Sequence, residues 1–120
     1  TNQSFYSIDY SLTSKSGNHT KQARFNPDFF LYKKQGDIEY ITVVEIKDDK
    51  DYSDINRAKF KWATKHFAEL NKQLIGSKIR QRYNFHFLSP ENYDEFFEYV
   101  KNGKLLEGKY ISNLDKELNI

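Results

Sequence analysis

The sequence predicts an α/β fold, of the α+β type with a mixed sheet, built from antiparallel hairpin strands and a βαβ crossover with helices flanking the sheet. Several segments alternate apolar and polar side chains or concentrate β-branched residues, as strands do. A long segment with apolar residues at helical spacing separates two of these strands. A strand, a helix and a strand in succession predict a right-handed crossover between parallel strands.

The first half of the chain is predicted to form strands. Residues Phe5 to Leu12 alternate in polarity, and a polar loop from Thr13 to Thr20 follows. A second, antiparallel strand is predicted from Arg24 to Tyr32. After a turn at Lys33 to Asp37, the segment from Ile38 to Lys47 has the continuous β-branched run of a central strand.

A long helix is predicted in the middle of the chain. An acidic loop ends at Ser53 or Asp54, either of which can cap a helix, and apolar residues recur at helical spacing from Ile55 to Leu74. Gly76 is expected to end this helix. The segment from Arg82 to Leu88 alternates in polarity and is predicted to form the next strand.

The C-terminal part is predicted to form two helices. Ser89 and Pro90 are typical of a helix start, and Asn102-Gly103 is typical of a helix end. Residues 112–118 are expected to form a short helix. The apolar residues expected to pack against the body are Tyr93, Phe96, Phe97, Val100, Leu105, Leu106, Tyr110 and Ile111.

Composition limits the class of protein. The 120 residues suffice for one domain, and because 38% are hydrophobic and 17% aromatic, the core must depend on Phe and Tyr. The absence of cysteine excludes disulfides, thiolate zinc sites and cysteine nucleophiles. No apolar run approaches the roughly 20 residues that span a bilayer. We therefore expect a cytoplasmic protein with no membrane segment.

The formal net charge is only +2, but the basic residues are concentrated between residues 57 and 82, where acids are scarce. One interpretation is a surface that binds nucleic-acid phosphates. A solvated helix face is the other interpretation, because exposed lysines are common. The candidate phosphate contacts are Arg57, Lys61, Lys65, Arg80 and Arg82.

The residues best suited to chemistry lie between Arg24 and Lys47. On a strand alternate side chains share a face, so Glu45 and Lys47 point one way and Ile46 the other. If residues 29–32 pair with residues 41–47, Asp28 comes to lie beside Glu45. Two carboxylates and an ammonium are then the minimum for metal-assisted phosphodiester cleavage. Taken singly, Pro-Asp and Glu-x-Lys are more often structural.

The motif formed by Pro27-Asp28, sixteen intervening residues and Glu45-Ile46-Lys47 resembles that of the PD-(D/E)xK nuclease superfamily. The residues around it, 24–31 and 43–47, resemble the endonuclease domain of type III restriction subunits and related helicase-linked defence proteins. A fainter likeness continues through residues 85–90 and 96–99. The resemblance implies a restriction-endonuclease-like core in a single domain over residues 1–120, as a fragment or terminal domain of a larger protein.

The resemblance also implies a function, that of a Mg²⁺- or Mn²⁺-dependent DNA endonuclease. Asp28, Glu45 and the backbone carbonyl of Ile46 would hold the metal, and Lys47 would hold or help deprotonate the attacking water. Lys59, one turn into the long helix, would assist as the Lys or Gln that such families often place there. A lysine stem lying over the core is the alternative for this residue. The implied partners are DNA and a helicase or ATPase domain or subunit, and a homodimer is allowed.

One departure from the superfamily concerns its N-terminal helix, which often supplies another acid. Here only Asp9 precedes Asp28, and no Glu precedes Glu39, so the activity of the isolated domain is left open. A catalytically silent module of the same fold, which binds DNA or docks a helicase, is the alternative function. An unrelated αβ binding domain is a third.

Overall fold

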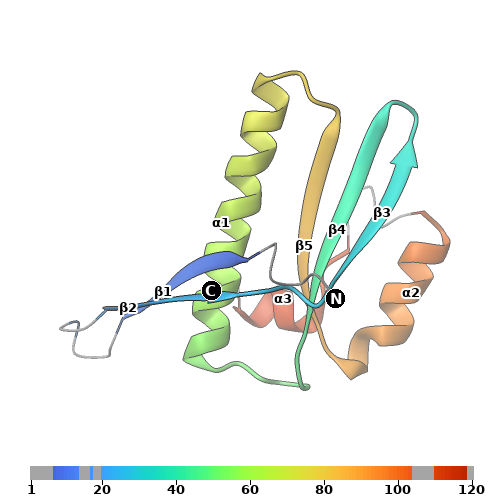
Figure 1. Ribbon diagram of the computed structural model, residues 1–120. Helices are drawn as coiled ribbons and strands as arrows, with labels where there is room; N and C mark the ends of the chain where they lie inside the picture. Colours follow the sequence, from blue (N-terminus) through green and yellow to red (C-terminus); the bar gives the residue numbers. More distant parts are fainter. Residues whose placement is uncertain (1–6, 14–16, 18–19, 104–109, 119–120) are drawn as a thin grey trace.

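The computed structural model describes residues 7–13, 17, 20–103 and 110–118. In these residues the mixed α/β class is confirmed, with an antiparallel hairpin, a mixed three-stranded sheet and flanking helices (Figure 1). The elements in chain order are β1 (Ile8–Thr13), β2 (Thr20–Phe25), β3 (Phe29–Gln35), β4 (Ile38–Ile46), α1 (Asp54–Gly76), β5 (Gln81–Leu88), the 3-10 turn η2 (Pro90–Asn92), α2 (Tyr93–Lys101) and α3 (Asn113–Leu118).

The sheet that carries the candidate site has the strand order β3-β4-β5. β3 and β4 are antiparallel, and the register pairs Phe29 with Val44 and Tyr32 with Ile41. β4 and β5 are parallel, with Glu45 paired to Phe87, and α1 connects them. The predicted crossover between parallel strands is thus confirmed.

The strand predicted from Arg24 to Tyr32 is wrong as a single element. The structure has two strands here, which end and begin on either side of Asn26, Pro27 and Asp28. β2 pairs with β1 in the hairpin, whereas β3 pairs with β4 in the other sheet. Pro27 explains the break, because proline lacks the N–H that a strand interior needs.

The core has two main layers, one on each face of the three-stranded sheet. On one face Ile41 and Val43 of β4 pack with Ala63 and Phe67 of α1. The β1–β2 hairpin closes this layer, since Ile8 and Phe25 belong to the same cluster. The other face packs against α2, and its buried members are Val44, Leu88, Phe96 and Tyr110. Figure 1 shows α1 and α2 on opposite sides of the sheet.

The helix α1 begins after Ser53, whose side chain accepts a hydrogen bond from the Asn56 amide, so the Ser53 cap is confirmed. The apolar face predicted for this helix is wrong at two residues. The residues expected to be buried at helical spacing are Ile55, Ala58, Trp62, Ala63, Phe67, Leu70 and Leu74. Of these Ile55 is exposed, whereas Phe60, which is not among them, is buried. The buried face of α1 therefore follows Asn56, Phe60, Ala63 and Phe67.

The predicted stripe of α2 is wrong in two positions. Phe96 is fully buried, but Phe97 is 56% exposed and Val100 is 38% exposed. α2 has only one neighbouring layer, so a helix of this length buries a single narrow face. Ile111 is also exposed, whereas Tyr110 is buried as expected. The predictions for residues 5, 6, 105 and 106 and for most of the loop between β1 and β2 fall outside the described residues.

A polar cluster attaches α3 to β5. The Asp115 carboxylate accepts hydrogen bonds from the amides of Phe87, at 2.9 Å, and Ser112, at 3.0 Å. It also lies 2.8 Å from Nδ1 of His86. His86 therefore has a titratable partner, one that sequence analysis did not identify. None of the helices in the described residues is long and apolar enough to cross a lipid bilayer.

Candidate active site

Asp28 is held against the end of β4 by two hydrogen bonds. Its amide donates to the Val44 carbonyl at 3.0 Å, and its Oδ2 accepts from the Ile46 amide at 2.7 Å. The carboxylate thus spans the position of Glu45 on the neighbouring strand. The strand pairing predicted from the sequence brings these two acids together, because Asp28 continues the register of Phe29 with Val44.

Glu45 is the most unusual carboxylate of the site, since it is only 5% exposed. One of its oxygens, Oε2, lies 3.3 Å from Nζ of Lys47. The other oxygen, Oε1, is buried and has no hydrogen-bond partner among the described residues. Burial raises the pKa of Glu45 to about 7, with Lys47 opposing the shift and the neighbouring Asp28 carboxylate adding to it.

Lys59 reaches the same place from α1. Its ammonium lies 5.3 Å from the ring centroid of Phe25 and 5.9 Å from that of Tyr10, a range in which cation–π attraction operates. Burial lowers the pKa of Lys59, and Lys47 lowers it further, whereas Glu45 and Asp28 raise it. Because the charges of Asp28, Glu45 and Lys47 all act on the pKa of Lys59, its ammonium lies close to these three residues.

The four charged residues that the sequence singled out are therefore neighbours in space. Glu45 and Lys47 lie on the face of β4 that packs against α1, and Lys59 approaches from that helix. Ile46 points into the opposite layer, where its side chain contacts the cluster around Val44, as strand alternation predicts. The role of its carbonyl as a ligand stays a prediction.

The two positions that sequence analysis missed are Tyr10 and Phe25. Both lie on the β1–β2 hairpin, and their rings flank the ammonium of Lys59. An alternating strand pattern shows that such residues face a core, but it does not show which charged side chain ends above them. The contact of both rings with Lys59 depends on the hairpin, which pairs Ile8 with Phe25 and so brings Phe25 close to Tyr10.

The donor set suits a hard divalent cation. No group of three or more His, Cys, Asp or Glu that could hold a metal occurs in the described residues, so the protein offers the two carboxylates of Asp28 and Glu45. Mg²⁺ is commonly held by one or two carboxylates with water and substrate phosphate completing its shell. The unpartnered Oε1 of Glu45 is an oxygen that such an ion would satisfy.

The basic residues predicted to bind phosphate do not gather in one patch. Arg57 is tied to the carbonyls of Tyr52, at 3.2 Å, and Glu117, at 2.9 Å. Lys61 and Lys65 lie exposed on α1, and the ammonium of Lys65 lies 4.9 Å from the Trp62 ring centroid.

Arg80 and Arg82 lie at the other end of the sheet from the acids. Arg80 pairs with Asp37 at 2.6 Å, and Arg82 donates to the carbonyls of Ile79 and Gln81. The register pairs Glu39 with Gln81, at the start of β5, and Glu45 with Phe87, near its end, so the two arginines are roughly 20 Å from the acids at about 3.3 Å per residue. Arg80 and Arg82 are therefore not part of the candidate site.

Comparisons of the chain with protein-family models, with curated proteins and with solved structures find no match. The chemistry of the site is therefore inferred from its own residues and their geometry.

Proposed function

We propose that the chain is a metal-dependent DNA endonuclease domain with a restriction-endonuclease-like core, which hydrolyses phosphodiester bonds in the manner of the type III restriction endonuclease domains that the motif resembles. Asp28 and Glu45 hold Mg²⁺ or Mn²⁺, with the Ile46 carbonyl as a further ligand. The mixed sheet with its crossover helix is the framework that this proposal requires.

The observation that carries the proposal is the environment of Glu45. Glu45 is a buried carboxylate beside a second carboxylate. Lys47 pairs with one of its oxygens, but the other has no hydrogen-bond partner among the described residues, which is costly in a fold that gains nothing from it. A divalent cation removes that cost, because it neutralises both acids and satisfies the free oxygen. Bound there, the ion would supply positive charge to the phosphate and lower the pKa of a water molecule.

The two lysines have separate roles in the proposed reaction. Lys47 is already paired with Glu45, so it is oriented toward the place where substrate oxygen would accumulate charge. Lys59 enters from the helix side, held over Tyr10 and Phe25, and adds a second cation at the same centre. In hydrolysis the attacking water, which Lys47 would hold, loses a proton to solvent and its oxygen forms a bond to phosphorus. The phosphorus–oxygen bond to the leaving nucleotide breaks, and the leaving oxygen takes up a proton from solvent.

A plasmid cleavage assay tests the function. With Mg²⁺, the wild-type chain is expected to convert supercoiled plasmid to nicked or linear forms, and EDTA is expected to stop the reaction. Lys47→Gln is expected to slow cleavage about 100-fold or more, the usual effect of losing one group that stabilises transition-state charge. Lys72→Gln, an exposed lysine farther along α1, serves as the control and should cleave like the wild type.

Two results would count against the proposal. Cleavage that survives unchanged in Lys47→Gln would mean that the observed activity does not come from this centre. Plasmid binding in a gel-shift assay, without cleavage in any divalent metal, would favour the catalytically silent module instead. A helicase or ATPase partner is a separate proposal. Co-purification from a host that expresses both this chain and the helicase or ATPase would test it.

A further inference from the structure

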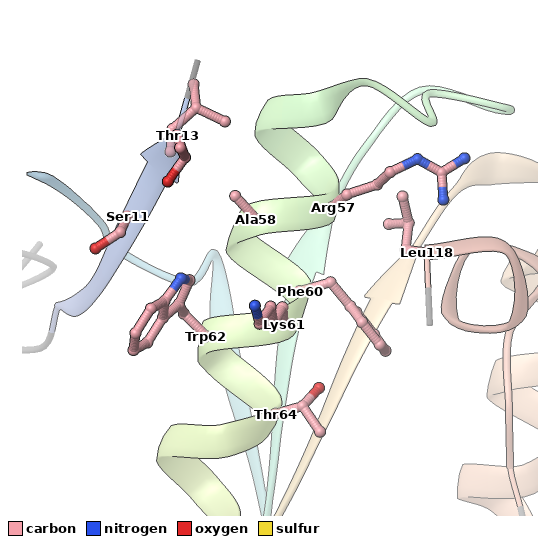
Figure 2. Close-up of a pocket in the computed structure, with 10 residues that line it drawn as sticks. Ser11, Thr13, Arg57, Ala58, Phe60, Lys61, Trp62, Thr64 and Leu118 are labelled. Carbon is pink, nitrogen blue, oxygen red and sulfur yellow. The ribbon is translucent and has the colours of Figure 1, made fainter. Parts of the chain in front are cut away.

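A hollow, which we call the Trp62 cavity, lies where α1 meets the β1–β2 hairpin and α3. Its volume is about 390 Å³, within the range of roughly 300–1,000 Å³ typical of small-ligand sites. Figure 2 shows side chains from β1 on one side of α1 and the end of α3 on the other. The residues of its lining that matter here are Ser11, Thr13, Arg57, Lys61, Trp62 and Leu118.

The lining of the Trp62 cavity has the chemistry of a nucleotide site. Among the described residues that line it, Arg57 and Lys61 are cationic and none is acidic. Arg57 is fixed by its bonds to backbone carbonyls on the Leu118 side of α1, away from Trp62, so Lys61 is the cation left to meet a phosphate beside the Trp62 ring (Figure 2). Ser11 and Thr13 add hydroxyl groups, and Trp62 adds an aromatic ring on which a base can stack.

The Trp62 cavity is next to the proposed catalytic centre. Trp62 follows Lys59 by three residues on α1, a spacing that places both side chains on adjoining parts of the helix surface. At about 1.5 Å of rise per residue the two positions are separated by only about 4.5 Å along the axis. Lys59 and Trp62 are therefore neighbours on the surface of α1.

We propose that the Trp62 cavity takes an unpaired nucleotide of a single-stranded DNA segment, with the base against the Trp62 ring and the phosphate near Lys61. The inference deepens the proposed nuclease function and rests on it for the identity of the strand. A base in an intact duplex is stacked on both sides and has no face to offer, so stacking on Trp62 selects a strand that is already separated or locally opened.

Trp62 provides a direct reporter, because it is the only tryptophan in the chain. The experiment follows its fluorescence in EDTA, where no cleavage occurs, during titration with single-stranded oligo-dT. Duplex DNA of equal length, heparin and inorganic phosphate are titrated in parallel. We expect quenching by the single strand alone, since the other three probes carry charge without an accessible base.

Lys61→Gln and Lys72→Gln form the matched pair of variants. Both lysines are exposed on α1, but only Lys61 lines the Trp62 cavity. Lys61→Gln should weaken oligo-dT binding and reduce the slope of log K against log salt by about 0.7, the contribution of one phosphate contact to a single strand. Lys72→Gln should leave affinity and slope unchanged, and circular dichroism verifies that both variants are folded.

Equal quenching by heparin or duplex DNA, or quenching by phosphate alone, would overturn the proposal, because each shows binding without base stacking. Absence of quenching by oligo-dT would overturn it as well. The outcome is separable from that of the plasmid assay. Oligo-dT binding without cleavage would refute the nuclease and leave the single-strand site, whereas cleavage without quenching would do the reverse.

Discussion

Replacement of Glu45 by glutamine is expected to stabilise the protein in a pH-dependent way. The pKa of Glu45 is raised from 4.5 to about 7, so between these values the folded state binds a proton that the unfolded state has lost. Stability therefore falls as pH rises from about 4.5 to 7, and the full cost is present above pH 7. At about 1.36 kcal/mol per pKa unit this cost is about 3 kcal/mol.

Glu45→Gln removes the buried charge but keeps the shape of the side chain. In urea denaturation with EDTA, the variant and the wild type should have equal free energies of unfolding at pH 4. At pH 8 the free energy of unfolding of the variant should be higher by up to about 3 kcal/mol. Glu69→Gln, an exposed glutamate on α1, is the control and should show no such difference. If Glu45→Gln is less stable than the wild type at pH 8, the Lys47 ion pair outweighs burial and the reasoning is refuted.

Three further predictions concern the framework around the site. Asp115→Ala should cost about 3 kcal/mol in urea unfolding, because it leaves buried hydrogen-bonding groups unpartnered, and a loss below 1 kcal/mol would contradict this. Asn71→Ala should lose about 2 kcal/mol by the same measurement, since the Asn71 amide both donates to and accepts from the Tyr83 backbone at the β5 edge. Phe96→Ala should lower the free energy of unfolding by about 3 kcal/mol or more, and Phe97→Ala by less than about 0.5 kcal/mol. Equal losses would show that both side chains are buried, as the sequence predicted.

The convergence of the acids could be predicted because it depends on local rules. Strand alternation puts Glu45 and Lys47 on one face, and a short turn after β3 sets the register that carries Asp28 to Glu45. The place of Lys59 follows from helical geometry once α1 is known to follow β4. These rules use sequence spacing alone.

Other features depend on neighbours far apart in the sequence, and spacing does not encode them. The apolar residues of α2 at positions 96 and 97 look alike, and only the position of the sheet decides that Phe96 is buried and Phe97 exposed. His86 acquires its partner because α3 folds back and presents Asp115, 29 residues away. The burial that raises the pKa of Glu45 likewise requires both α1 and the sheet.

Titration of the chain with Mn²⁺, followed by the EPR signal of the free ion, tests whether Asp28 and Glu45 hold a divalent cation. If Asp28 and Glu45 form a cation site, the wild type binds one ion per chain, and both Asp28→Asn and Glu45→Gln lose it. Asp28→Asn is the sharper variant, because an asparagine oxygen can still accept from the Ile46 amide and preserve the local fold. Failure of the wild type to bind Mn²⁺, or binding by Asp28→Asn with equal affinity, would contradict the account.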